Sequence, residues 1–183
     1  DTPDGKYEYL GYIKNKDGTA FNKFVCFDPS VINDDGIIRL YYGTSMPRGM
    51  CLPKPLKAVA ASIFEKIYGK SKEEILSDPS VWGANMITLC DDMLTVKTDA
   101  VRIIPEKTRN TSFDKHAFFE GSSIRKINNT YYFIYSSQKN HELCYATSKY
   151  PDRNFKYGGT IVSNGDVEFK GRKEKDRVNA TGT

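Results

Sequence analysis

Short runs of alternating apolar and polar residues make up most of the chain, and each run ends at turn-forming residues. The clearest series lies in residues 117–162, where the runs 121–127, 130–137, 142–148 and 155–162 follow one another. A period of two is typical of strands with one buried face, and the short connections favour antiparallel neighbours. The series therefore predicts a four-stranded antiparallel meander, the size and form of one β-propeller blade.

Residues 24–105 predict a preceding blade of the same kind. Its first hairpin is "FVCFDPSVIN" with "IIRLYYG", and its second is "ANMITLC" with "LTVKTDAVRII". The turns "NDDG" and "INNT" supply Asp-Gly and Asn-Asn, which tolerate the positive φ of tight hairpins. An insertion, roughly residues 54–80, separates the two hairpins.

Helical spacing replaces alternation within this insertion. Val59, Ile63 and Ile67 recur on one helix face, and a glycine suited to ending a helix follows them. A second short helix is predicted over "SKEEIL", where Ser71 is the N-cap and Glu74 occupies the capping-box position.

A further repeat bears on the extent of the fold. Residues 2–13, "TPDGKYEYLGYI", match residues 150–161, "YPDRNFKYGGTI", without a gap. We therefore expect residues 1–13 to be the last strand of an earlier blade and residues 163–183 to lead toward a later one. About two blades plus one strand cannot close a ring, so the predicted fold class is all-β, part of a propeller with a small helical insertion. Blade faces left open in such a fragment would be apolar, and we expect them to drive self-association.

Two acidic residues occupy the same place in the two blades. Phe27-Asp28-Pro29-Ser30 aligns with Phe119-Glu120-Gly121-Ser122, which puts one carboxylate at the start of each innermost strand. Innermost strands line the central channel, so both acids should face a common funnel. Convergent carboxylates suit glycosidic bond cleavage, in which one protonates the leaving oxygen and another activates water. The alternative is structural, since an Asp before Pro commonly forms a turn.

The residues alone favour Asp28 as the general base opposite Glu120 as the acid, and a third nearby carboxylate could raise the pKa of the acid. The combination of "FDPSVINDDGIIRLYYG" with "FFEGSSIRKINNTYYFIYSS" resembles glycoside hydrolase family 43, the five-bladed propeller arabinofuranosidases and β-xylosidases, over essentially residues 1–170. This resemblance implies an inverting enzyme with Glu120 as general acid and Asp28 as the residue that tunes its pKa. The family's base is an Asp on the first blade, to which no residue here corresponds, so we expect this chain alone to be inactive.

The two roles of Asp28 differ in geometry. A tuning carboxylate should lie about 4–6 Å from Glu120, whereas an inverting base should lie about 6.5–9.5 Å away. We expect the shorter separation.

Four further residues are predicted to contact substrate. Phe27 and Phe119 flank the acids at matched positions and suit the walls of a small sugar subsite, with packing between the blades as the alternative. Trp82 and Asn85 open the strand that follows the insertion and are predicted at the rim of the funnel. Packing beneath the insertion is the alternative for Trp82.

Histidine and cysteine give no metal-ligand spacing. His116 and His141 are assigned structural or surface roles. Cys26 and Cys144 lie in apolar runs and are predicted to be buried free thiols, which slightly favours a reducing, cytoplasmic compartment. Members of the family often hold a metal in the central channel through a His on a later blade. The resemblance allows such a metal in a complete propeller, but no cofactor is assigned to the residues of this chain.

Charge and hydropathy narrow the partners. Lys and Arg number 27 against 23 Asp and Glu, and the two signs are mixed along the chain, so no nucleic-acid footprint is predicted. No apolar run approaches the roughly 20 residues of a membrane span. The expected partner is an oligosaccharide substrate. The alternative function is a non-catalytic propeller that binds carbohydrate or protein.

Overall fold

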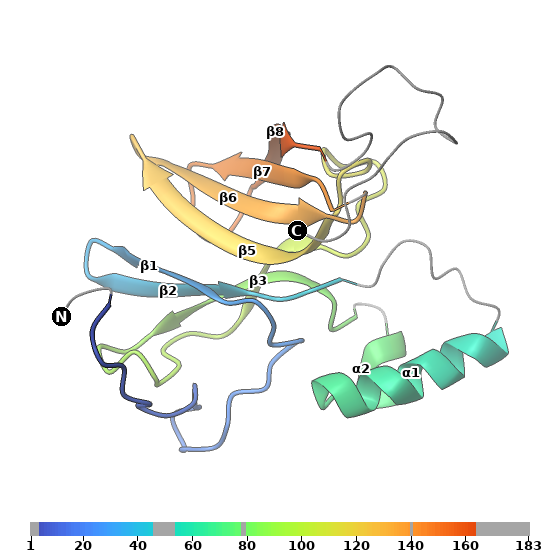
Figure 1. Ribbon diagram of the computed structural model, residues 1–183, viewed down its shortest axis with the longest axis horizontal. Helices are drawn as coiled ribbons and strands as arrows, with labels where there is room; N and C mark the ends of the chain where they lie inside the picture. Colours follow the sequence, from blue (N-terminus) through green and yellow to red (C-terminus); the bar gives the residue numbers. More distant parts are fainter. Residues whose placement is uncertain (1–3, 46–53, 78–79, 140, 164–183) are drawn as a thin grey trace.

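The computed structural model describes residues 4–45, 54–77, 80–139 and 141–163, and these form two four-stranded antiparallel sheets (Figure 1). Each sheet is a simple meander, in the order β1-β2-β3-β4 and β5-β6-β7-β8. The prediction of two propeller-type blades is therefore confirmed. Nearly all of the predicted segment 163–183, and Cys51, lie outside the described residues.

The first sheet is interrupted by the insertion between its second and third strands. Its strands are β1 (Ser30–Asp34), β2 (Ile37–Tyr42), β3 (Gly83–Leu89) and β4 (Val101–Pro105). The first strand was expected from residue 24 but begins only at Ser30, because Asp28 has a φ of 42° and Pro29 has no N–H to donate. At the following turn, Asp35 and Gly36 both have the positive φ predicted from "NDDG".

The second sheet follows the predicted pattern closely. Its strands are β5 (Phe118–Ile127), β6 (Thr130–Ser137), β7 (Leu143–Ser148) and β8 (Lys156–Val162). Asn128 and Asn129 form the β5–β6 turn with φ of 47° and 57°. The sheet carries β-bulges on both sides of Glu120, and the functional site is built around them.

The main hydrophobic core lies between the two stacked sheets, which Figure 1 shows one above the other. Tyr41 from the first sheet meets Phe133 from the second, with ring centroids 6.0 Å apart. Phe118 and Tyr135 extend the same aromatic cluster, and Ile124 is fully buried beside them. Strands β1 and β5 are in contact, as expected for the innermost strands of adjacent blades.

The insertion forms two helices at one end of the sheets, α1 (Lys54–Tyr68) and α2 (Lys72–Leu76). The capping box at Ser71 and Glu74 is present as predicted. The predicted stripe of Val59, Ile63 and Ile67 is exposed, and the opposite face of α1 packs toward Trp82. No helix in the described ranges is long and apolar enough to cross a membrane.

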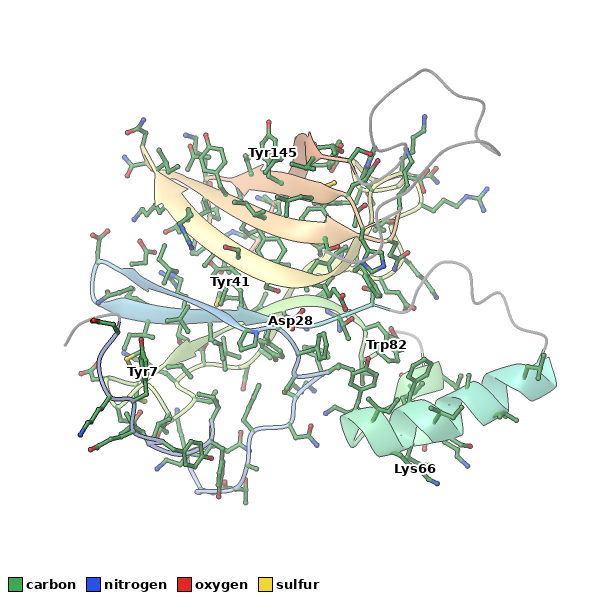
Figure 2. The ribbon with its side chains drawn as sticks, viewed as in Figure 1. Tyr7, Asp28, Tyr41, Lys66, Trp82 and Tyr145 are labelled. Carbon is green, nitrogen blue, oxygen red and sulfur yellow. The ribbon has the colours of Figure 1, made fainter. Side chains whose placement is uncertain are left out.

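Residues 4–13 form no strand, which differs from the prediction. Tyr7 and Tyr9 are more than four-fifths exposed, and Leu10 and Tyr12 are exposed as well (Tyr7 is labelled in Figure 2). The matching strand β8 is stabilised by pairing with β7, whereas residues 4–13 have no such neighbour among the described residues. Self-association through exposed apolar surface stays a prediction.

Candidate active site

Asp28 lies in the bend that precedes β1, at the boundary between the two sheets (Figure 2). Its side chain is exposed, and its Oδ2 accepts a hydrogen bond of 3.1 Å from the backbone N–H of Gly121. That amide belongs to the residue after Glu120. The bond therefore brings the two matched acids of the repeat into one site across the blade boundary.

Glu120 sits on an irregular part of β5. The register of β5 against β6 shifts between Phe118 and Glu120 and again between Glu120 and Ser123. Gly121 has a φ of 73°, a conformation that favours glycine at this position. Bulges near functional sites change the direction of a side chain, and here they leave Glu120 half-buried at the strand start.

The environment of Glu120 favours its protonated form. Burial raises the pKa of the Glu120 carboxyl, and the negative charge of Asp28 raises it further, while His141 opposes the rise. A carboxyl with a raised pKa is suited to general acid catalysis. The predicted separation of about 4–6 Å between the Asp28 and Glu120 carboxyls stays a prediction.

Matched tyrosines hold the segments that lead to the two acids. The Tyr42 hydroxyl donates to the carbonyl of Lys23 at 3.0 Å, and the Tyr135 hydroxyl donates to the carbonyl of His116 at 2.7 Å. Burial raises the pKa of both phenols, so they remain protonated donors. An equivalent tyrosine hydrogen bond therefore holds the segment before Asp28 and the segment before Glu120.

The backbone after β2 is hydrogen-bonded to both segments that lead to the acids. The N–H of Gly43 donates to the carbonyl of Phe27, and the N–H of Ser45 donates to the carbonyl of Phe119, each at 2.8 Å. A Cβ at Gly43 would stand 2.1 Å from the carbonyl oxygen of Gly83, so only glycine fits there. These bonds fix the relative position of Phe27 and Phe119.

Phe27 and Phe119 are both partly exposed, so neither is part of the core between the blades. The ring of Phe27 meets Tyr68 edge-on at 6.1 Å, and the ring of Phe119 meets His141 edge-on at 4.9 Å. Aromatic surface therefore lies on both sides of the acid pair.

Trp82 and Asn85 are not at the rim, which corrects their predicted position. Trp82 is 1% exposed, and its indole N–H donates to the carbonyl of Ile75. Asn85 is fully buried and accepts a hydrogen bond of 2.6 Å from Arg102. Every residue of β3 is buried, because the sheet is covered on both faces.

Two residues near the acids were not predicted as site residues. Tyr68, at the end of α1, interacts electrostatically with Glu120 and Asp28; burial and then these two charges raise the pKa of its phenol. His141, assigned a structural or surface role, lies close enough to Glu120 to oppose the rise in the pKa of that carboxyl. A pattern search misses both because they come from an insertion and a turn, outside the alternating strands.

The remaining histidine and cysteines lie elsewhere. Cys144 is buried as predicted, but Cys26 is exposed because it precedes β1 rather than lying within a strand. His116 bonds to Glu142 at 2.8 Å beside Cys144. No residue of the chain is assigned to the channel metal that the resemblance allows.

Two meander blades in contact through their first strands, with paired carboxylates at the blade boundary, define part of a β-propeller of the glycoside hydrolase class. No family model matches the chain. A xylosidase/arabinosidase of Thermoclostridium stercorarium is 40% identical to it across 97% of the chain. The chain spans 33% of that relative's length.

Solved structures support the same class. A family 43 β-xylosidase/α-arabinofuranosidase from a compost metagenome, in complex with xylotriose, is 27% identical with a TM-score of 0.50; the match covers 74% of this chain and 41% of that one. A family 43 enzyme of Xanthomonas citri, complexed with xylose, has the same fold at 24% identity and a TM-score of 0.51, covering 75% of this chain and 40% of that one. The chain is therefore similar in sequence and fold to glycoside hydrolase family 43 enzymes, and its two sheets form part of a five-bladed propeller of their kind.

Proposed function

We propose that this chain supplies the proton donor and its modulator to an inverting glycosidase that acts on arabinose- or xylose-containing glycans. The observation that carries the proposal is the hydrogen bond that the amide beside Glu120 donates to Asp28, together with the raised pKa of Glu120. The names of the relatives, xylosidase/arabinosidase and β-xylosidase/α-arabinofuranosidase, supply the substrate class.

Each residue has a defined part in the reaction. Protonated Glu120 donates its proton to the glycosidic oxygen as the bond to the sugar breaks, so that the leaving group departs as an alcohol. Asp28 accepts the hydrogen bond of the Gly121 amide, and its negative charge adds to the rise that burial causes in the pKa of Glu120. A carboxylate on the opposite face of the sugar must activate the attacking water. No residue of these 183 is assigned that role, so we expect no turnover by this chain alone.

The test is hydrolysis by the full-length gene product of p-nitrophenyl arabinofuranoside and p-nitrophenyl xyloside. We expect turnover of at least one of them, with NMR detecting the inverted anomer as the first product. Absence of hydrolysis together with saturable sugar binding would favour the alternative function, a non-catalytic carbohydrate-binding propeller. A retained anomer would contradict the inverting mechanism.

Changing Asp28 to Asn is expected to move the basic limb of the kcat/KM profile to lower pH. Removing the negative charge lowers the pKa of Glu120, and the reaction requires its protonated form, so activity falls at a lower pH than in the wild type. At neutral pH we expect a loss of about 10–100-fold. The exposed Asp91→Asn is the matched control and should leave the profile unchanged. A basic limb that does not move would remove the tuning role of Asp28.

Tyr68 is included in the proposed substrate-contacting set with Phe27 and Phe119. Its phenol interacts electrostatically with both acids and its ring contacts Phe27, so we place it where the leaving-group sugar would meet the site. We expect Tyr68→Ala to raise KM for oligosaccharides about 10-fold through lost stacking, with a smaller change in kcat. Tyr68→Phe, which keeps the ring, should recover most of the loss. Equal loss in both variants would assign the effect to the hydroxyl.

A further inference from the structure

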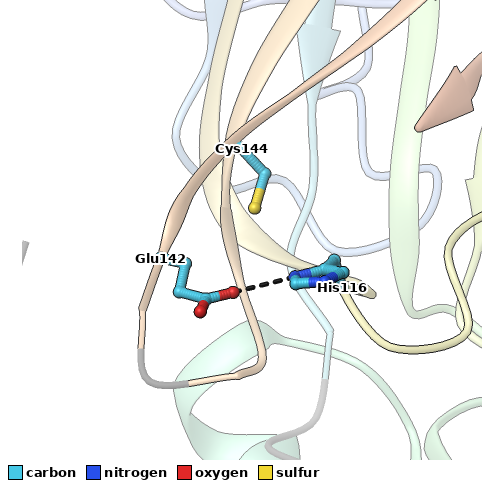
Figure 3. A group of neighbouring side chains, drawn as sticks. All are labelled: His116, Glu142 and Cys144. Atoms are coloured by element: carbon cyan, nitrogen blue, oxygen red, sulfur yellow. Dashed lines mark hydrogen bonds and ion pairs between the residues drawn. The ribbon is translucent and has the colours of Figure 1, made fainter. Parts of the chain in front are cut away.

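A second group of chemically reactive side chains lies apart from the acid pair. His116, Glu142 and Cys144 each contribute one donor atom, and these atoms all lie within 4.8 Å of one another (Figure 3). Cys144 is fully buried and Glu142 is 5% exposed. His116 precedes β5, and the other two residues lie at the start of β7, so two separate segments of the second blade meet here.

The surrounding structure holds the three side chains in place. The Nδ1 of His116 and the Oε2 of Glu142 are 2.8 Å apart. The imidazole stacks on the ring of Tyr157, with centroids 4.5 Å apart and planes 4° from parallel. The Sγ of Cys144 lies 3.4 Å from the hydroxyl of Thr160. The donors are therefore gathered before any ligand binds.

We propose that His116, Glu142 and Cys144 bind one divalent transition metal ion of the zinc type. A thiolate, an imidazole and a carboxylate are each zinc ligands, and three protein donors leave the fourth position of a tetrahedral site for a water. Calcium and magnesium prefer oxygen donors only, so a buried thiol argues against either. The thiolate of Cys144 thus distinguishes this site from calcium and magnesium sites, in which all donors are oxygens.

Charge balance suits a buried ion. Binding releases the thiol proton of Cys144 and displaces any proton shared by His116 and Glu142, after which one thiolate and one carboxylate neutralise the divalent charge. The second oxygen of Glu142, Oε1, keeps the hydroxyl of Ser163 at 3.1 Å and the Lys139 ammonium at 3.8 Å as outer partners. Such outer partners orient a ligating carboxylate.

The metal links the segment before Glu120 to the turn that carries His141. The ring of His141 lies edge-on to that of Phe119, the residue before Glu120. An ion held by the adjacent Glu142 would thus fix the turn without contacting substrate. The proposed role is structural and does not depend on the glycosidase activity.

Cobalt(II) titration of chelator-treated protein under reducing conditions tests the site. We expect a thiolate-to-cobalt charge-transfer band that saturates at one equivalent, and about 10-fold or greater weakening in Cys144→Ser and His116→Gln. Cys90→Ser and His141→Gln are matched controls that should retain the band. Zinc in hundredfold excess over its Kd should raise the Tm by about 5–10 °C.

Three results would overturn the proposal: no charge-transfer band, a band that survives Cys144→Ser, or equal weakening in His116→Gln and His141→Gln. If the Cys144 variant does not fold, X-ray absorption spectroscopy of the zinc-loaded wild type determines whether sulfur is a ligand of the metal. A single sulfur neighbour supports the site, and a shell of nitrogen and oxygen alone refutes it.

Discussion

Glu120→Gln is expected to lower kcat of the full-length protein on arabino- or xylo-oligosaccharides by about 10²–10⁴-fold. The amide keeps the shape of the side chain but has no acidic proton for the leaving oxygen. KM should change little, because the lost interaction forms in the transition state. The measurement is steady-state hydrolysis with wild type and variant compared at the wild-type pH optimum.

The leaving group separates proton donation from other roles of Glu120. A glycosyl fluoride departs without a proton, so Glu120→Gln should retain most of the wild-type rate on that substrate. The basic limb of the pH profile should also disappear, since the raised pKa of Glu120 sets the pH above which the wild type loses its acid. Glu73→Gln, an exposed change on α2, is the control. Equal losses on oligosaccharide and fluoride would contradict the general acid assignment.

Alternation identified the blades because each strand has a face turned toward the core. Strands β6, β7 and β8 begin and end within one residue of their expected bounds. Strand β5 begins earlier than expected, at Phe118, because its start contains the β-bulges around Glu120. The repeat also placed Asp28 and Glu120 in one site, although 92 positions separate them in the chain. Matching positions in consecutive blades become neighbours at their boundary, so this juxtaposition follows from the repeat itself.

Side-chain exposure was less predictable where a sheet is covered on both faces. Trp82 directly precedes β3 and Asn85 lies within it; this strand is buried throughout, and a sequence pattern cannot distinguish a rim position from an interior one there. The converse holds for Val59, Ile63 and Ile67, which are apolar but exposed. Their spacing predicts the helix correctly, but the helix packs through Ala61 and Phe64, because the aromatic ring of Phe64 fits against Trp82 at 5.6 Å.

The position of Tyr68 near the acids could not be predicted from the sequence either, because it depends on how the insertion packs. The insertion places the end of α1 beside Phe27, and only this packing brings the phenol near the acids. The proposed catalytic pair belongs to the repeated blade, whereas part of the proposed sugar-contacting surface comes from an insertion in one blade. Specificity could therefore vary through the insertion while the acid pair stays fixed.

Asp34→Asn is expected to destabilise the protein by about 3–5 kcal/mol, because it removes one partner of a buried ionic network. Asp34 lies at the end of β1 with its side chain 4% exposed. It accepts hydrogen bonds from Arg39 of its own sheet and from Lys126 and Tyr131 of the other. The network thus joins the two blades at the end of β1, whereas Asp28 and Glu120 lie near the starts of β1 and β5. Urea unfolding at pH 7 measures the loss.

The pH dependence identifies the cause of the loss. Burial alone would raise the pKa of Asp34, but the bonds from Lys126, Tyr131 and Arg39 outweigh burial and lower it to about 2. The unfolded chain has an Asp pKa of about 3.9. The stabilisation from ionised Asp34, about 2–3 kcal/mol, is therefore complete above roughly pH 5 and is lost as the pH falls toward 2.

A matched neighbour makes this test specific. Asp35 also pairs with Lys126, at 3.0 Å, but its side chain is 91% exposed, so Asp35→Asn should cost less than about 1 kcal/mol. The stability difference between wild type and Asp34→Asn should narrow as the pH is lowered from 5 to 3, whereas a packing defect would leave it constant. A constant difference, or equal effects at Asp34 and Asp35, would show that the blades are held together by the aromatic core alone. A narrowing difference would show that the ionised carboxylate of Asp34, through its bonds to Lys126 and Tyr131, stabilises the contact between the two blades.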